Sequence, residues 1–321
     1  MKTLADIKKI AVLGAGTMGP GIAQTYAMGG YEVTMWTRSE ATREKAKVSL
    51  KTSLETFAEE GEIKPEDVDV IFNRIHFAMT VEEAVAGADM IQETIVENRD
   101  AKAALYEQLA ACVPADVIIA SNTSAMNIFE VVPEKLLPQM IICHWYAPPH
   151  VIPLVEVVKS EQAPQEFADV AVALLKKCGK TAVLMKKFIK GYIVNRLQQC
   201  LNREVFYLLD NGYCDAEAID LAAKASFIPR ACVLGLLKRA DFGGLDMTAN
   251  NYKNKSYTMP EHGDEMPKVL AEKVEAGELG IKTGKGFYDY TGKDIDELKA
   301  KRDKQLFEVF RLTKKFMEDP V

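Results

Sequence analysis

Two residues that can exchange a proton lie near each other in the stretch Gln139–Val158. An apolar run of strand length, Met140–Cys143, ends at His144, and a second β-branched run (154–158) carries Glu156 in its middle. A carboxylate inside such a strand is costly to bury unless a donor bonds to it, and the His144 imidazole is the nearest candidate. A histidine oriented by a carboxylate can act as a general base. On the residues alone, a structural Glu156 bonded to backbone, with His144 at the surface, is an equal alternative.

A glycine-rich turn near the N-terminus has the pattern G-x-G-x-x-G. It consists of Gly14, Ala15, Gly16, Thr17, Met18 and Gly19. The turn follows an apolar run (7–13), opens a helical stretch, and is followed by a second strand-like run (31–37). In such a βαβ unit the three glycines allow a tight turn, backbone approach to a pyrophosphate, and close helix–strand packing. The diphosphate would lie at the helix N-terminus, where unpaired N–H groups point. The motif therefore predicts dinucleotide binding rather than a plain packing turn.

The end of the second strand bears on the choice between NAD and NADP. An Asp or Glu there would accept hydrogen bonds from the adenosine ribose hydroxyls. Thr37 occupies this position, and Arg38 and Ser39 follow it. Without a carboxylate a 2′-phosphate is not repelled, and Arg38 with Ser39 can bind it through charge-assisted hydrogen bonds. The sequence favours NADP over NAD; a solvated Arg38 in a loop is the alternative.

The elements that position these residues alternate between strands and helices in the first half of the chain. Strands are expected at 7–13, 31–37, 71–77, 88–92, 117–120, 140–143 and 154–158, with helices at 80–86 and 99–112. This alternation predicts an α/β Rossmann-type fold with a parallel, doubly wound sheet. A polar segment over 40–69 has helical spacing broken by glycine and proline, which predicts a helical hairpin inserted in the sheet domain.

From about residue 190 the chain contains amphipathic helices and no further strand-like runs. Helices are expected at 191–210, 215–225, 230–240 and after Asp294. With 321 residues the chain is long enough for two domains. We expect a dinucleotide-binding domain over 1–187 and an all-α substrate and dimerisation domain over 188–321. The apolar helices are more than one small domain needs to cover itself, so a homodimer through this domain is our hypothesis.

Composition excludes several classes of protein. The formal net charge of −6 argues against nucleic-acid binding, which needs a basic stripe. No apolar run approaches membrane-spanning length, and the N-terminus lacks a signal-peptide core. The six cysteines are scattered without a C-x-x-C pair, and the four histidines, His262 among them, form no metal-ligand pattern. We therefore expect a cytoplasmic protein that binds a small molecule, without metal, nucleic acid or membrane as a partner.

Taken together, the motifs resemble the L-3-hydroxyacyl-CoA dehydrogenase family, which includes 3-hydroxybutyryl-CoA dehydrogenases and the lambda-crystallin/L-gulonate dehydrogenases. The resemblance extends over about residues 7–290. It is carried by the glycine-rich turn with Met18, Ile95–Asn98, Ser121–Ser124, His144 with Glu156, Gly191–Arg196 and Lys282–Tyr288. It implies hydride transfer between NAD(P) and the 3-hydroxy/3-oxo carbon of an acyl substrate.

The resemblance also implies roles for residues of the substrate site. His144 would be the general base and Glu156 its orienting group, in the way the acid of a catalytic triad orients its histidine. Ser124 and Asn195 would hold the substrate oxygens and polarise the carbonyl. A helix-capping Ser124 and an Asn195 at a domain interface are the alternatives on residue type alone.

Three further residues match cofactor contacts in the family. Glu97 and Lys102 match positions that hold the nicotinamide ribose, and Lys282 matches a contact from the end of the chain. On residue type alone, Glu97 and Lys102 can also be an ordinary pair on a helix surface.

The chain departs from the family pattern at three places that concern the substrate. Ala147 replaces the usual Asn three residues after the catalytic His. Ser53 matches a contact to the CoA nucleotide, but the Lys expected nearby is Glu60, which is unfavourable beside a phosphate. The segment Ser226–Ala231 replaces a Gly-rich substrate loop, and its Arg230 can pair with a free carboxylate.

The expected substrates follow in an order. A short-chain L-3-hydroxyacyl-CoA ranks first, because it is the commonest substrate in this family. A free L-3-hydroxy acid or small polar alcohol without CoA ranks second. A non-catalytic dinucleotide-binding structural protein is the alternative from another functional class.

Overall fold

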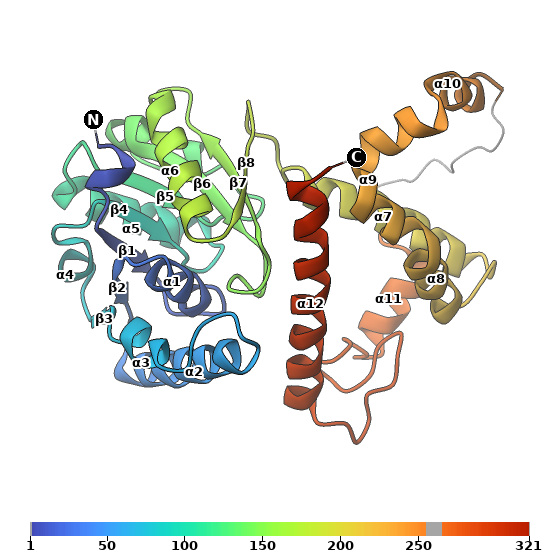
Figure 1. Cartoon of the computed structure of the whole chain (residues 1–321), viewed down its shortest axis with the longest axis horizontal. Coiled ribbons are helices and arrows are strands. Elements are labelled where there is room, and N and C mark those ends of the chain that lie inside the picture. The colour runs from blue at the N-terminus through green and yellow to red at the C-terminus, as the bar shows by residue number, and fades with distance from the viewer. Residues whose placement is uncertain (1, 255–264, 321) are drawn as a thin grey trace. The chain divides into compact units, whose positions relative to one another are not determined.

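The computed structural model describes residues 2–254 and 265–320, so His262 lies outside the described residues. The chain divides into two compact units, Met1–Val194 and Asn195–Val321 (Figure 1). The expected boundary at 187/188 lies a few residues before this division.

The first unit is built on an eight-stranded sheet in the order β3-β2-β1-β4-β5-β6-β7-β8. The strands are β1 (Lys9–Leu13), β2 (Glu32–Trp36), β3 (Ile75–Ala78), β4 (Met90–Glu93), β5 (Ile118–Ser121), β6 (Met140–Trp145), β7 (Leu154–Lys159) and β8 (Thr181–Leu184). Neighbouring strands are parallel except β6 and β7, which are antiparallel. The Rossmann-type sheet that the sequence predicts is confirmed, and its expected all-parallel arrangement is corrected at β7.

The length of the connection explains why β7 reverses direction. Only eight residues (146–153) join the end of β6 to the start of β7. A parallel crossover needs a dozen or more residues, whereas an antiparallel neighbour can be reached by a short turn. β8 was not expected from the sequence, because this edge strand has four residues that are only partly covered.

Helices cover both faces of the sheet, which makes it doubly wound (Figure 1). One apolar cluster packs the sheet against α1 (Gly19–Met28), α2 (Glu40–Glu59) and α6 (Gln165–Lys177). The other packs it against α4 (Val81–Val85) and α5 (Arg99–Cys112). The strands are therefore covered on both sides, as expected for near-continuous apolar runs.

The helical hairpin expected over 40–69 is confirmed by α2 and by α3 (Asp67–Phe72). The hydroxyl of Ser39 caps α2 by accepting a hydrogen bond from the backbone N–H of Thr42 at 3.2 Å. Leu50 and Leu54 are buried against the sheet domain. The strand expected at 71–77 begins only at Ile75, because α3 continues through Phe72.

The second unit is helical, as expected. Its helices are α7 (Val194–Asp210), α8 (Ala216–Ala222), a π-helical turn (Ala223–Phe227), α9 (Ile228–Gly243), α10 (Leu245–Asn254), α11 (Lys268–Glu275) and α12 (Ile295–Glu318). Gly235 interrupts α9 with a φ of 71°, a conformation that other residues rarely adopt. None of the helices in the described part of the chain combines the length and apolar character needed to cross a membrane.

The helical unit leaves much of its apolar surface uncovered. Among its described residues, Phe307 is the large apolar side chain that is buried, whereas Leu237 and Phe242 are 85% and 65% exposed. Extended apolar surface of this kind usually marks a protein–protein contact. The homodimer through this unit stays a prediction, which sedimentation equilibrium tests directly: a monomer mass at micromolar concentration would contradict it.

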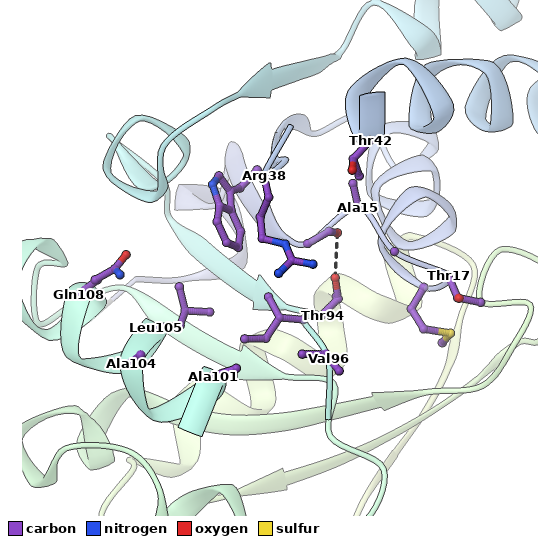
Figure 2. Close-up of a pocket in the computed structure, with 15 residues that line it drawn as sticks. Ala15, Thr17, Arg38, Thr42, Thr94, Val96, Ala101, Ala104, Leu105 and Gln108 are labelled. Atoms are coloured by element: carbon purple, nitrogen blue, oxygen red, sulfur yellow. Dashed lines mark hydrogen bonds between the residues drawn. The ribbon is translucent and has the colours of Figure 1, made fainter. Parts of the chain in front are cut away.

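The glycine-rich turn connects β1 to α1 in a conformation that depends on two of its glycines. Gly14 has a φ of 119°, and its carbonyl accepts a hydrogen bond from the Thr94 hydroxyl at 2.9 Å (Figure 2). A Cβ at Gly19 would collide with that same carbonyl oxygen, whereas a Cβ at Gly16 would point into open space. Gly19 is therefore needed for packing, and Gly16 leaves room for a ligand.

We expect these two glycines to respond differently to alanine. Gly19→Ala overpacks the turn and should lower the free energy of unfolding by about 1–3 kcal/mol. Gly16→Ala should change it by less than about 0.5 kcal/mol, while still weakening dinucleotide binding. Urea unfolding and cofactor titration of both variants measure the two effects. Equal loss of stability in both variants would contradict this division of roles.

Candidate active site

His144 and Glu156 are direct partners across the antiparallel strands β6 and β7. The register places both side chains on the same face of the sheet, near the end of β6. His144 Nδ1 lies 3.1 Å from Glu156 Oε2. His144 is 4% exposed and Glu156 is fully buried. The sequence-based expectation that the imidazole bonds the buried carboxylate therefore agrees with this geometry, and the alternative of a surface His144 is wrong.

Glu156 accepts hydrogen bonds from three donors besides His144. The Tyr146 hydroxyl donates to Oε2 at 2.6 Å, and the backbone N–H groups of Ile193 and Val194 donate to Oε1 at 2.9 and 3.1 Å. Burial raises the pKa of this carboxyl, but the hydrogen bonds outweigh burial and bring the pKa below its ordinary value. The carboxylate is therefore ionised at neutral pH and able to hold the His144 ring.

Two tyrosine rings enclose the imidazole. Tyr192 stacks on it with ring centroids 4.6 Å apart, and Tyr146 makes an edge contact at the same distance. The Tyr192 hydroxyl donates to the Thr123 carbonyl at 2.7 Å, which anchors that ring. With Nδ1 engaged by Glu156, Nε2 is the nitrogen of His144 that remains to exchange a proton with a substrate. The sequence motif Gly191–Arg196 contains Tyr192, but sequence reasoning gave this residue no role; it follows Gly191, and both residues have a positive φ.

A cavity of about 670 Å³ lies beside the glycine-rich turn. Its lining comes from the turn, the end of β2 with the residue Arg38 after it, the start of α2, the segment that follows β4, and α5 (Figure 2). The lining residues are Gly14, Ala15, Gly16, Thr17, Met18, Trp36, Arg38, Thr42, Thr94, Ile95, Val96, Ala101, Ala104, Leu105 and Gln108. The turn and the open space at Gly16 fit a dinucleotide, since the backbone can approach a diphosphate there.

Of the three residues expected to select the cofactor, Arg38 lines this cavity, whereas Thr37 and Ser39 do not. Arg38 is exposed and reaches from the end of β2 into the cavity (Figure 2). Ser39 is used as the N-cap of α2. Thr37 is buried, and its hydroxyl contacts the Met79 sulfur at 3.5 Å, so it does not line the cavity. Among the described residues, the lining of the cavity contains no carboxylate.

Glu97 holds the loop that carries Ser124. Its carboxylate accepts hydrogen bonds from the Thr123 hydroxyl and from the backbone N–H groups of Ser124 and Ala125, the latter at 3.1 and 3.3 Å. Burial raises the pKa of Glu97, but these bonds and the nearby Lys102 ammonium lower it overall. The Ser124 side chain is exposed at the carboxyl end of β5, where ligands bind in sheets of this kind.

Lys102 is fully buried and paired with Glu93, at 2.6 and 2.8 Å from its two carboxylate oxygens. Glu93 also accepts hydrogen bonds from the hydroxyls of Tyr106 and Ser121, at 3.0 and 2.6 Å. The alternative of an exposed Glu97–Lys102 helix pair is therefore wrong, although Lys102 Nζ lies 3.5 Å from Glu97. Sequence reasoning missed Glu93, although it lies directly after a short run that the sequence predicts to be a strand, 88–92.

Four expected site residues remain: Ser53 in the first unit, and Asn195, Arg230 and Lys282 in the helical unit. The Ser53 hydroxyl on α2 is buried and has no hydrogen-bond partner among the described residues. Asn195 is half-buried in α7, Arg230 is exposed in α9 with its Nε donating to the Ser226 carbonyl, and Lys282 is exposed. These three belong to the helical unit. Their contacts to substrate or cofactor stay predictions.

Comparison with protein families identifies two matching models. The NAD-binding domain of 3-hydroxyacyl-CoA dehydrogenase matches residues 9–188, and the C-terminal domain of the same enzyme matches residues 191–290. Together they cover most of the chain, and they confirm the resemblance that the sequence motifs indicated.

Individual relatives carry different substrates in their names. The chain is 32% identical to 5-formyl-3-hydroxy-2-methylpyridine 4-carboxylate 5-dehydrogenase of Mesorhizobium japonicum, covering 95% of this chain and 98% of that protein. It is 36% identical to a probable 3-hydroxybutyryl-CoA dehydrogenase of Bacillus subtilis, covering 90% and 99%.

A solved structure of the pyridine-carboxylate enzyme, described as an NAD⁺-dependent dismutase, superposes on this chain with a TM-score of 0.84. The two are 29% identical, and the match covers 96% of this chain and 99% of the other. The fold, the glycine-rich turn and these similarities agree. The chain therefore belongs to the 3-hydroxyacyl-CoA dehydrogenase family and is an NAD(P)-dependent oxidoreductase.

Proposed function

We propose that this protein interconverts a secondary alcohol and a carbonyl, with His144 as the proton acceptor and donor and Glu156 as its orienting group. The observation that carries the proposal is the buried His144–Glu156 pair at the carboxyl end of β6. The cavity at the glycine-rich turn opens at the carboxyl end of β1 in the same sheet. Ligands of doubly wound sheets bind outside these strand ends.

The chain's own residues account for the proton movements of this reaction. In the oxidative direction, neutral His144 accepts the hydroxyl proton at Nε2, and the ionised Glu156 stabilises the resulting imidazolium. In the reductive direction, the same nitrogen returns a proton to the carbonyl oxygen. A bound nicotinamide supplies the other half of the chemistry, the acceptance or return of a hydride.

Binding of the cofactor and the substrate oxygens is divided among several elements in this proposal. Gly14, Gly16, Thr17, Met18 and Arg38 would hold the dinucleotide, since they line the cavity. By family resemblance, Glu97 and Lys282 would add contacts to it, whereas the expected contact from Lys102 does not fit its burial against Glu93. Ser124 and Asn195 would hold the substrate oxygens and polarise the carbonyl.

For the substrate itself, we propose a free 3-hydroxy or 3-oxo acid without CoA. The Ser53 hydroxyl, expected to meet the CoA nucleotide, is buried. Glu60, at the end of α2, stands where the family has a Lys, and its charge would repel a CoA phosphate. The full-length match to an enzyme named for a pyridine carboxylate supports the same choice. This reverses the order that the sequence motifs indicated.

A short-chain L-3-hydroxyacyl-CoA is the second candidate substrate. It is supported by both family models and by the similarity to a probable 3-hydroxybutyryl-CoA dehydrogenase.

His144→Ala should lower the turnover rate by about 10²- to 10⁴-fold, because the general base is removed. Cofactor affinity should stay nearly unchanged, since His144 does not line the dinucleotide cavity. Steady-state kinetics and cofactor titration measure the two quantities. His76→Ala is a matched control, because the exposed His76 pairs with the exposed Glu32 on the neighbouring strands β3 and β2, and neither residue lines the cavity. Full turnover by the His144 variant would refute the mechanism.

A matched set of substrates separates the two substrate candidates. Acetoacetate and acetoacetyl-CoA carry the same 3-oxo group, and small aromatic hydroxy carboxylates extend the set. We expect kcat/KM to be higher for the free acids than for the CoA thioester. A preference for acetoacetyl-CoA by a factor of about ten or more, equal to about 1.4 kcal/mol, would establish the second candidate instead.

We propose that NADP is the preferred cofactor. Arg38 reaches into the cavity, which has no carboxylate in its described lining to repel a 2′-phosphate. Arg38→Ala should therefore lower the NADP/NAD affinity ratio about tenfold or more, through loss of a charge-assisted contact. Arg43→Ala is the control, because Arg43 pairs with Glu40 one turn away. An unchanged ratio in the Arg38 variant would remove the basis for NADP preference.

We propose a cytoplasmic location, because all six cysteines are free thiols, as in proteins of reducing compartments. Cell fractionation tests it, and recovery outside the cytoplasm would contradict it.

A further inference from the structure

The Tyr146 hydroxyl and the His144 imidazole share one oxygen of Glu156. Tyr146 donates to Oε2 at 2.6 Å, and His144 Nδ1 lies 3.1 Å from the same atom. The other carboxylate oxygen is occupied by the backbone N–H groups of Ile193 and Val194. The tyrosine hydroxyl thus acts on the atom through which Glu156 holds the catalytic ring.

Ring packing alone does not account for this arrangement. A phenylalanine at position 146 could make the same edge contact with His144, whose ring centroid lies 4.6 Å away. The hydroxyl adds a short bond to a charged acceptor, and such bonds are about twice as strong as bonds between neutral groups. The Tyr146 hydroxyl therefore acts mainly on the Glu156 carboxylate.

We propose that Tyr146 is a positioning residue that holds the Glu156 carboxylate and weakens its attraction for the imidazolium form of His144. The inference deepens, and rests on, the proposed role of His144 as general base. A donor on Oε2 withdraws charge from the atom that faces Nδ1, so the imidazolium is stabilised less. Removing that donor should therefore strengthen the attraction between Glu156 and a protonated His144.

The other ionisable groups that face the pair within the first unit leave this role to Tyr146. Tyr192 stacks on the imidazole, but its hydroxyl is bound to the Thr123 carbonyl rather than to Glu156. Burial raises the pKa of Tyr192, which keeps it neutral. Glu97 acts on Tyr192 only through space, and its own carboxylate is engaged by the Ser124 loop.

Tyr146→Phe tests the proposal, since it keeps the ring and removes the hydroxyl. The readout is the NMR titration of the His144 ring proton in cofactor-free protein, which needs no knowledge of the substrate. The chain has four histidines, so His144→Gln assigns the signal. We expect the pH midpoint of His144 to rise by about 0.5–1 unit in Tyr146→Phe. The midpoint of His76 should not move.

Two further variants keep the result interpretable. Tyr31→Phe is a control, because it removes the hydroxyl of a buried tyrosine whose ring lies under Lys177, in another part of the chain. It should leave the pH midpoint of His144 unchanged. 3-Fluorotyrosine at position 146 is a stronger donor of nearly the same shape. It should move the His144 midpoint downward, and it provides the test if Tyr146→Phe does not fold.

The outcomes distinguish this inference from the proposed function. An unchanged or lowered midpoint in Tyr146→Phe, with His144→Ala inactive, overturns the role of Tyr146 alone. If the midpoint rises but His144→Ala is fully active, the general-base role of His144 is wrong, while the effect of Tyr146 on the His144–Glu156 pair stands. With an active substrate, the pH limb of kcat/KM should move with the NMR midpoint, whereas a merely structural role would lower kcat without moving the limb.

Discussion

The Glu156 carboxylate has no contact with solvent, and its charge persists there because four hydrogen bonds reach it. Two come from side chains next to each other around the end of β6, His144 and Tyr146. The other two come from the backbone at Ile193 and Val194, where the chain leaves the first unit. An unpaired buried charge would cost several kcal/mol. The need to satisfy this one group therefore ties His144, the proposed general base, to the segment that leads into the helical unit.

The reversal of β7 makes that arrangement possible. A parallel β7 would begin at the opposite edge of the sheet, and Glu156 would then lie away from His144. The eight-residue connection (146–153) prevents a crossover, so the two strands run antiparallel and place the pair in direct register. Buried Lys180 supports this connection by donating to the carbonyls of Pro149 and Ile152 at 2.6 and 3.0 Å. Burial lowers the pKa of Lys180 to about 7.

A second buried carboxylate organises the other half of the site. Glu93 at the end of β4 binds Lys102, Tyr106 and Ser121, which belong to the neighbouring helix and strand. Because Glu93 takes the Lys102 ammonium, Glu97 is left to hold the backbone of the Ser124 loop. Buried ion pairs of this kind contribute little net stability compared with apolar packing. Their consequence here is geometric, since they hold the segment that lines the cavity after β4 next to the loop that carries Ser124.

The sequence by itself determined the local features: the glycine-rich turn, most strands, the helical hairpin over 40–69 and the change to helices near 190. These follow from spacing and residue type within a few turns of chain, where periodicity and glycine geometry are sufficient. His144 and Glu156 could also be paired from the sequence, because a carboxylate in a buried strand needs a donor. The direction of β7, the edge strand β8, the burial of Lys102 against Glu93 and the contacts of Tyr146 and Tyr192 with the His144–Glu156 pair were decided only by the tertiary structure. Each of these depends on strand register, on connection length, or on contacts between residues far apart in the chain, which no local pattern specifies.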